Sequence, residues 1–413
     1  MVARGYAGGP VARYLLLGTV LFLTLGGLVM IYSASYAADY VKFGDSAYHL
    51  KSQIMWIASG LTAMLVLARM DYHAVKRIAW PLVGVANVLL MLTLTHGIGK
   101  WGAQRWLVIG PMRLQPSEFA KLAVVLALAV LLADRRKREL PFTQQVGWFA
   151  LVVMPVVALI MLQPDMGTTM AILVASFVLL ALGDVGGRYL IGLVGVAAVA
   201  IPAMIALEPY RMARFLSFLD PWKDPKGDGY QIIQALYAFG SGGVRGVGLG
   251  MSRQKFFYLP AAHTDFIFAI IGEELGLIGT LAVVAAFVVF AYAGLRIAIG
   301  AKDHLGKLLA GGLTALIVIQ ALMNMAAVTS VMPVTGITLP LVSYGGSSMI
   351  FTMGCIGLVL SVSRHGLRAE RARVRGGDTQ KGIPSADTAQ RGRDGRPHLS
   401  SIDGGRAPVR KRA

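Results

Sequence analysis

The sequence predicts an all-α polytopic membrane protein with ten transmembrane helices, and three observations support this prediction. Of the 413 residues, 56% are hydrophobic and 15% are charged, whereas an ordinary soluble domain has about 25% charged residues. Ten apolar runs approach the length of about 20 residues that a helix needs to cross the hydrocarbon core. These runs are continuous rather than alternating, which excludes a β-barrel. The single cysteine, Cys355, excludes a disulfide-rich scaffold.

The expected spans cover roughly residues 14–34, 52–68, 78–95, 117–133, 146–162, 166–182, 189–207, 266–295, 308–330 and 344–363. The first run precedes further spans and lacks a small-residue cleavage site, so we expect it to be retained. Residues 1–13 form a short N-terminal segment, residues 14–364 form the membrane domain, and residues 365–413 form a tail.

The distribution of lysine and arginine places both termini in the cytoplasm. With ten spans the two ends lie on one side. Short inner segments then carry 13 of these residues and short outer segments carry 6, as the positive-inside rule requires. Residues 208–262, between the seventh and eighth spans, become a long extracytoplasmic loop.

The tail 365–413 is rich in Gly, Pro and Arg and has almost no large apolar residues, so we expect it to be disordered. It supplies much of the net charge of +18. That charge therefore indicates membrane topology and contact with anionic lipids rather than nucleic-acid binding.

Ionisable residues near the bilayer are the best candidates for function, because each is costly there unless paired or hydrated. Arg105 and Trp106 precede the fourth span, and an interfacial anchor is an alternative reading of this pair. Glu118 and Lys121 lie three residues apart on one helix face and can pair. Ser117 is the expected N-cap of that helix.

Further candidates follow the later spans. Asp165 occupies a tight outer turn, where it would line a site or cap the next helix. The long loop ends in a glycine-rich stretch, 245–260, whose Arg253 and Lys255 could hold phosphate; a plain flexible loop is the alternative. His263 lies just beyond this stretch.

Asp265 opens the eighth span. Nearby helical N–H groups would keep it ionised, and an ionised carboxylate can act as a general base; a simple cap is the alternative. Glu273 and Glu274 lie deeper and need a polar interior or internal donors. Residues 332–348, with two prolines and several hydroxyls including Ser343 and Ser347, read as a loop that dips into the fold near a site.

Cations and carboxylates therefore alternate along the outer side of the predicted bundle. An anionic headgroup on an outer-leaflet lipid, together with an acid–base step, fits this pattern. A transporter would more naturally place its site near the bilayer midplane.

These stretches resemble the SEDS family (shape, elongation, division and sporulation) of bacterial wall proteins over residues 14–364. The motifs that carry the resemblance are Gln104-Arg105-Trp106, Gln115-Pro116-Ser117-Glu118, Gln163-Pro164-Asp165-Met166-Gly167-Thr168, Tyr230-Gln231, the 246–260 run, His263-Thr264-Asp265-Phe266-Ile267-Phe268, Glu273-Glu274-Leu275-Gly276 and Ser343-Tyr344-Gly345-Gly346-Ser347-Ser348. The stretches 333–340 and 250–255 look more like the FtsW/SpoVE branch than the RodA branch.

The resemblance implies a multi-pass protein of the bacterial cytoplasmic membrane that polymerises lipid II into glycan strands during cell division or sporulation. It implies an extracytoplasmic active site, inversion at the anomeric carbon and an undecaprenyl-pyrophosphate leaving group. It places the catalytic carboxylate at Asp265. The candidate substrate-binding residues are Arg105, Trp106, Glu118, Lys121, Asp165, Arg253, Lys255, His263, Ser343 and Ser347.

The resemblance also implies a class B penicillin-binding transpeptidase as partner, and it leaves open a divalent cation, Mg²⁺ or Mn²⁺. One departure concerns Ala261, because the family usually has Pro-Glu where this chain has Pro260-Ala261. Two other functions fit the same spans: a lipid II flippase, and a non-enzymatic scaffold of the division machinery.

Overall fold

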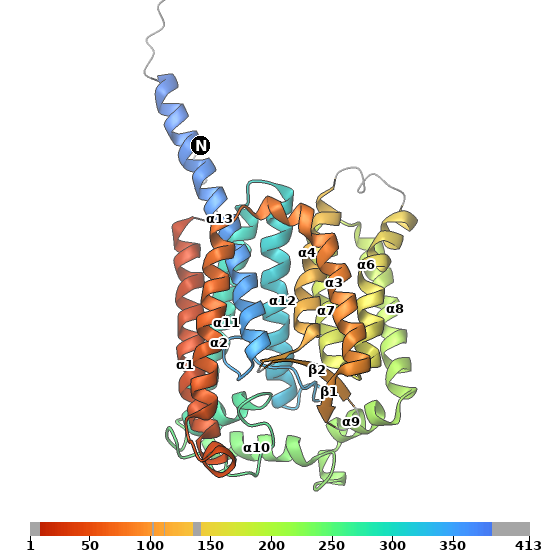
Figure 1. The fold of residues 1–413 in the computed structure, drawn as a ribbon, viewed down its shortest axis with the longest axis vertical. Helices are drawn as coiled ribbons and strands as arrows, with labels where there is room; N and C mark the ends of the chain where they lie inside the picture. The colour runs from red at the N-terminus through yellow and green to blue at the C-terminus, as the bar shows by residue number, and fades with distance from the viewer. Residues whose placement is uncertain (1–8, 101–102, 111, 135–141, 382–413) are drawn as a thin grey trace, which may run out of the picture. The chain divides into compact units, whose positions relative to one another are not determined.

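A computed structural model describes residues 9–100, 103–110, 112–134 and 142–381 (Figure 1). The chain divides into two compact units, residues 1–369 and 370–413. Residues 365–381, which the sequence analysis placed in a disordered tail, are helical. The sequence there contains four arginines, which favour helix, and its next proline is Pro384. The remaining tail, 382–413, and residues 1–8 lie outside the described residues.

Each of the ten predicted runs coincides with a helix. The long helices are α1 (Pro10–Phe43), α2 (Tyr48–Arg69), α3 (Val75–His96), α4 (Pro116–Ala133), α6 (Phe142–Leu162), α7 (Met166–Leu182), α8 (Gly187–Ala206), α11 (Ile267–Ile299), α12 (His304–Val328) and α13 (Gly346–Lys381). Among the described residues, eight of them are long and apolar enough to cross a membrane, whereas α6 and α7 contribute shorter apolar segments. The chain is therefore a multi-pass membrane protein.

Shorter elements fill the connections. They are the 3₁₀ helices η1 (Tyr72–Ala74) and η2 (Pro221–Lys223), and the helices α9 (Pro209–Leu219) and α10 (Tyr230–Gly242) in the long loop. The stretch before α4 forms a small antiparallel sheet in the order β1 (Ile98–Lys100), β2 (Ala103–Ile109) and β3 (Met112–Leu114). The all-helical prediction therefore missed three strands. Strands β1 and β3 have only three residues each, and the seven residues of β2 do not alternate between apolar and polar.

The centre of unit 1 is formed by α4 and α12 and by the apolar part of α13, whose residues are mostly buried. None of the residues of α8 is buried, and Ser217 is the buried residue of α9. Figure 1 shows α8 along one edge of the bundle and the small sheet beside one end of the helices. The polar loops near that end can therefore rest on a rigid apolar core.

The α11 helix is broken at Gly276, whose φ of 65° and ψ of −160° are not helical. Backbone groups released by the break bond to the preceding loop. Val247 and Gly248 donate N–H bonds to the carbonyls of Glu273 and Glu274, and Leu277 and Ile278 donate to residues 243 and 244. Unpaired backbone groups within a membrane-spanning helix are costly. The loop therefore supplies hydrogen bonds that the broken helix lacks.

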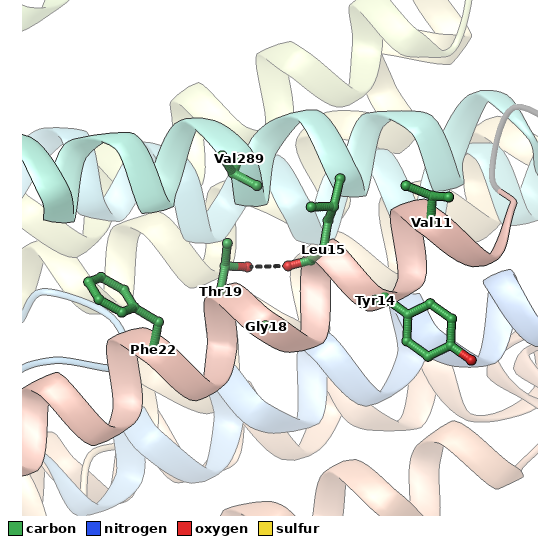
Figure 2. A pocket seen from close by; sticks show the side chains of 7 residues that line it. All are labelled: Val11, Tyr14, Leu15, Gly18, Thr19, Phe22 and Val289. Carbon is green, nitrogen blue, oxygen red and sulfur yellow. Dashed lines mark hydrogen bonds between the residues drawn. The ribbon is translucent and has the colours of Figure 1, made fainter.

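A groove of about 410 Å³ lies between α1 and α11. Figure 2 shows its lining, which runs from Val11 to Phe22 on α1 and includes Val289 of α11. The Thr19 hydroxyl in this lining donates to the Leu15 carbonyl at 3.1 Å. This apolar surface suits lipid chains and lacks the charged groups that a reaction site needs.

Candidate functional site

Asp265 lies immediately before α11, at the end of the long loop. The N-cap of α11 is Phe266, with no side-chain cap bond, so Asp265 is not a simple cap. Its backbone carbonyl accepts a hydrogen bond of 2.8 Å from the Asn324 amide, which also donates to the Ile337 carbonyl at 2.7 Å. Asn324 therefore holds the Asp265 backbone against the loop that joins α12 to α13.

The Asp265 carboxylate faces that loop at Gly336. A Cβ atom at Gly336 would lie 3.7 Å from Asp265 Oδ2, and Gly336 has a φ of +69° that side chains other than glycine rarely adopt. Among the residues that the structure describes, none donates a hydrogen bond to the carboxylate. Its oxygens are thus available to a ligand.

Burial raises the pKa of Asp265 to about 6, while Arg105 and Arg214 act to lower it and Asp165 acts to raise it. The sequence predicted that nearby helical N–H groups would keep Asp265 ionised; Phe266 rather than Asp265 occupies the N-cap position, and burial opposes ionisation. A carboxylate with this pKa is mostly ionised at neutral pH yet more basic than an ordinary aspartate, which suits a general base.

Arg105 projects from β2 and fastens the turn between α6 and α7. Its Nε donates to the Gln163 carbonyl at 3.2 Å, and its guanidinium also donates to the Pro164 carbonyl. Asp165, the next residue, caps α7 through the Thr168 N–H at 3.1 Å and the Thr168 hydroxyl at 2.9 Å. The capping alternative for Asp165 is confirmed, and the capped carboxylate still influences Asp265.

Trp106 follows Arg105 on β2. It is half-buried and lies in register with Ile98 of β1. This position places Trp106 on the small sheet, whose strand β2 contacts α3 and α4, and an aromatic residue near a helix end is consistent with an interfacial anchor.

Glu118 and Lys121 form the predicted pair, with 2.8 Å between Lys121 Nζ and Glu118 Oε1. Both side chains are buried, and Lys121 also donates to Gln320 Oε1 at 2.5 Å. Gln320 in turn donates to the Thr338 carbonyl at 3.1 Å. Through Gln320, the pair is thus linked to the loop between α12 and α13. The expected Ser117 cap is wrong, because Gln115 occupies the N-cap position without a side-chain bond.

The stretch predicted to dip into the fold, residues 332–348, is irregular and largely protected backbone as far as residue 345, whereas its last three residues begin α13. Ser343 donates to the Thr264 carbonyl at 2.6 Å and accepts from the Leu339 N–H at 2.9 Å. Ser347, at the start of α13, accepts from the Gln115 N–H at 3.1 Å and donates to the Arg113 carbonyl at 3.2 Å. Ser343 thus positions backbone beside Asp265, whereas Ser347 joins the start of α13 to the segment before α4.

His263 belongs to a second polar cluster, with Asp39, His49 and Tyr344. The His49 ring lies 4.5 Å from the His263 ring and 4.6 Å from the Tyr344 ring, measured between centroids. His49 Nδ1 contacts the buried Asp39 carboxylate. Burial and the neighbouring His49 lower the pKa of His263 to about 4, so this imidazole is neutral at neutral pH.

Arg253 and Lys255 are not gathered with Arg105. Lys255 is buried, lies 3.1 Å from Glu274 and donates to the Gly250 carbonyl at 2.5 Å. Glu274 accepts from the Ser33 hydroxyl at 2.7 Å. These contacts give Lys255 a structural role, whereas the Arg253 side chain is exposed.

Sequence reasoning missed several residues of this site. Arg214 on α9 acts to lower the pKa of Asp265, and Asn324 bonds to the Asp265 carbonyl. His49 and Asp39 belong to the polar cluster that contains His263. The amphipathic character of residues 209–219 could have indicated α9. Asn324 could have been noticed as a polar residue within an apolar run.

The structure gives limited support to a protein-built metal site. Among the described residues, no group of three or more His, Cys, Asp and Glu side chains is arranged to hold a metal ion. Mg²⁺ often binds through one or two carboxylates together with substrate phosphates, and Asp265 is the open carboxylate at this site.

The sequence model of the FtsW, RodA and SpoVE family, described as a cell cycle protein, matches residues 13–367. The chain belongs to this family. Stage V sporulation protein E of Bacillus subtilis (strain 168) is 41% identical over 352 residues, which cover 84% of this chain and 95% of that protein. A probable peptidoglycan glycosyltransferase FtsW of Trichlorobacter lovleyi is 40% identical and covers 84% of this chain and 92% of its own.

Solved structures agree with this assignment. A chain from a study of polymerization and crosslinking by a peptidoglycan synthase complex superposes with a TM-score of 0.70 at 31% identity, covering 88% of this chain and 99% of that one. The rod shape determining protein RodA of Thermus thermophilus superposes with a TM-score of 0.63 at 28% identity, covering 88% and 98%. The helical membrane fold described above is thus the fold of this family.

Proposed function

We infer that this protein is a peptidoglycan glycosyltransferase, and we propose that it polymerises lipid II. The activity follows from its membership of the family and from the names of relatives that it matches over more than nine-tenths of their length. The observation that supports a catalytic site at Asp265 is its carboxylate, which is bonded to no described donor and lies under the influence of two arginines.

The proposed reaction begins with Asp265 removing the proton from the 4-hydroxyl of the acceptor GlcNAc. That oxygen attacks the anomeric carbon of the donor MurNAc, and a new C–O bond forms with inversion. The bond from that carbon to the undecaprenyl-pyrophosphate oxygen breaks, and the pyrophosphate leaves with the electron pair. Arg105 is the nearby cation best placed to stabilise the developing charge, with exposed Arg253 as a further candidate.

We propose that α6 and α7 also cross the membrane, which gives ten spans, two cytoplasmic termini and an extracytoplasmic loop 208–262. This topology places Asp265 on the outer side, where lipid II headgroups are exposed. A class B penicillin-binding transpeptidase is the proposed partner, supported by the similarity to a chain of a peptidoglycan synthase complex. A divalent cation bound through Asp265 and the substrate pyrophosphate would supply Lewis-acid chemistry; the roles of Asp265 and the arginines do not depend on it.

The test is glycan-strand formation from lipid II by the purified chain, with and without the transpeptidase. We expect Asp265→Asn to lower the rate by about 10²–10⁴-fold, the usual contribution of a general base. Asp45→Asn is the matched control, because Asp45 is an exposed carboxylate on the same proposed side, paired with Lys51. Full activity of Asp265→Asn would refute the assigned base.

The same preparation separates the two alternatives. A flippase would move lipid II between leaflets of vesicles without forming strands. A scaffold would form no strands and would tolerate Asp265→Asn in cells. Strand formation from substrate offered in detergent, where no transport is needed, favours the enzyme over both.

A further inference from the structure

The helix α9 lies in the long loop, apart from the core, and carries two half-buried arginines three residues apart. Arg211 donates to the Met204 carbonyl of α8 at 3.1 Å. Arg214 instead donates from NH1 to the Val334 carbonyl at 3.0 Å, in the loop between α12 and α13. The two side chains share a helix but join different parts of the molecule.

The Arg214 contact reaches the reaction site through a short path. Val334 lies two residues before Gly336, the glycine that faces Asp265 Oδ2. The following residue, Ile337, is bonded through its carbonyl to Asn324, which also holds the Asp265 carbonyl. The Arg214 contact therefore acts on one end of the backbone segment that borders the carboxylate.

Arg214 is also fixed in orientation. Its guanidinium lies 4.7 Å from the Tyr210 ring centroid on the same helix, a distance at which a cation and an aromatic face attract. Arginine presents five donors in a rigid fork, so one N–H can hold Val334 while the charge remains directed at the site. Lysine would supply the charge but not the fork.

We propose that Arg214 is a positioning residue of the glycosyl-transfer site, which anchors residues 334–337 beside Asp265 and keeps α9 against the site during the reaction. This inference rests on the proposed function. It gives the long loop a role in the chemistry, because α9 belongs to that loop. Helix α8, which precedes α9, has no buried residue.

The charged groups that act on Asp265 come from three elements: Arg105 from β2, Arg214 from α9 and Asp165 at the start of α7. Loss of Arg214 leaves one arginine against one aspartate, so the pKa of Asp265 should rise further above about 6. A base with a higher pKa is protonated over a wider acidic range. The acid limb of the pH–rate profile should then move to higher pH.

The experiment compares the pH–rate profiles of strand formation for wild type, Arg214→Gln, Arg214→Lys and Arg211→Gln. If one nearby charge shifts a pKa by about one unit, Arg214→Gln should lose about fivefold more activity at pH 6 than at pH 8. Arg214→Lys should retain the wild-type acid limb but turn over more slowly at every pH. Arg211→Gln, the matched control, should keep both the limb and the rate within about twofold.

An Arg214→Gln variant with the wild-type rate and the wild-type acid limb would overturn the proposal, and so would an equal loss or an equal shift in Arg211→Gln. If Arg214→Gln does not fold, Arg214→Lys decides, because wild-type turnover in that variant would show that the fork is unnecessary. Failure of the proposed function is distinguishable, since wild type would then form no strands at any pH.

Discussion

Helix α11 and the segment that leads into it bear two kinds of carboxylate, and their surroundings differ completely. Glu273 accepts from the Arg253 N–H at 2.9 Å and from the Ser252 hydroxyl, while Glu274 contacts Lys255 at 3.1 Å. Asp265, one residue outside the start of α11, is bonded to no described donor through its carboxylate. The glutamates hold the glycine-rich loop in place, whereas the oxygens of Asp265, the proposed base, are bonded to no described donor.

The contrast shows why buried charge alone does not identify a reaction site. Both glutamates are more deeply buried than Asp265, yet their hydrogen bonds are complete, and fully bonded buried groups build structure. The group that combines partial burial, cationic neighbours and free oxygens is the one with a raised pKa. In this protein, the free hydrogen-bonding capacity of a carboxylate indicates the candidate base better than the burial of that carboxylate does.

The largest effect should come from Lys255→Met, which leaves Glu274 buried without its cation. Breaking one side of a buried ion pair costs about 3–5 kcal/mol, so we expect a large fall in melting temperature in detergent. Lys255→Met combined with Glu274→Gln should recover most of the loss. If Lys255→Met alone were as stable as wild type, the structural role of the Lys255–Glu274 pair would be refuted.

Asn324→Leu should have the next largest effect, because its amide bonds to the carbonyls of both Asp265 and Ile337. Leaving two protected carbonyls without a donor costs about 1–3 kcal/mol, and the Asp265 backbone should lose its fixed position. Strand formation should therefore fall more steeply than the melting temperature. Gln320→Leu is the control, since Gln320 bonds to the same loop at Thr338 but not to Asp265.

The pH dependence of stability tests the raised pKa of Asp265. The pKa of Asp265 is raised in the folded protein from 3.8 to about 6, so the folded state loses stability relative to the unfolded chain as pH rises through that window. Asp265→Asn removes this cost and should melt at a temperature equal to or above that of wild type at pH 7.5. The difference should vanish near pH 4; a variant that is less stable at pH 7.5 would contradict the pKa direction.

Ala261→Glu should have the smallest effect on stability. Ala261 is exposed and already has a φ of +56°, so glutamate meets the same backbone strain, and the change should stay within about 0.5 kcal/mol. Its carbonyl receives bonds from Thr264 and Phe266, which shape the turn before Asp265. Thermal melting tests this neutrality, and strand formation then reports what the added carboxylate does.

The sequence predicted the helices and much of the outer rim, because long apolar runs and charges at their ends are local signals. The Glu118–Lys121 pair, for example, follows from a spacing of three. The break at Gly276 and the role of Asn324 depend on contacts between segments far apart in the chain. The direction of the Asp265 pKa also required knowledge of its surroundings, since the order of residues suggested a helix cap that Phe266 occupies instead.

The interruption of α11 divides one transmembrane element into two mechanical parts. Its outer part, residues 267–275, is tied through backbone bonds to residues 247 and 248, while the part beyond Gly276 continues through the bilayer. The part beyond Gly276 is tied to the same stretch, because Leu277 and Ile278 donate to residues 243 and 244, so a force on residues 243–248 reaches both parts. A protein that stimulates the activity would therefore act most directly by binding this stretch.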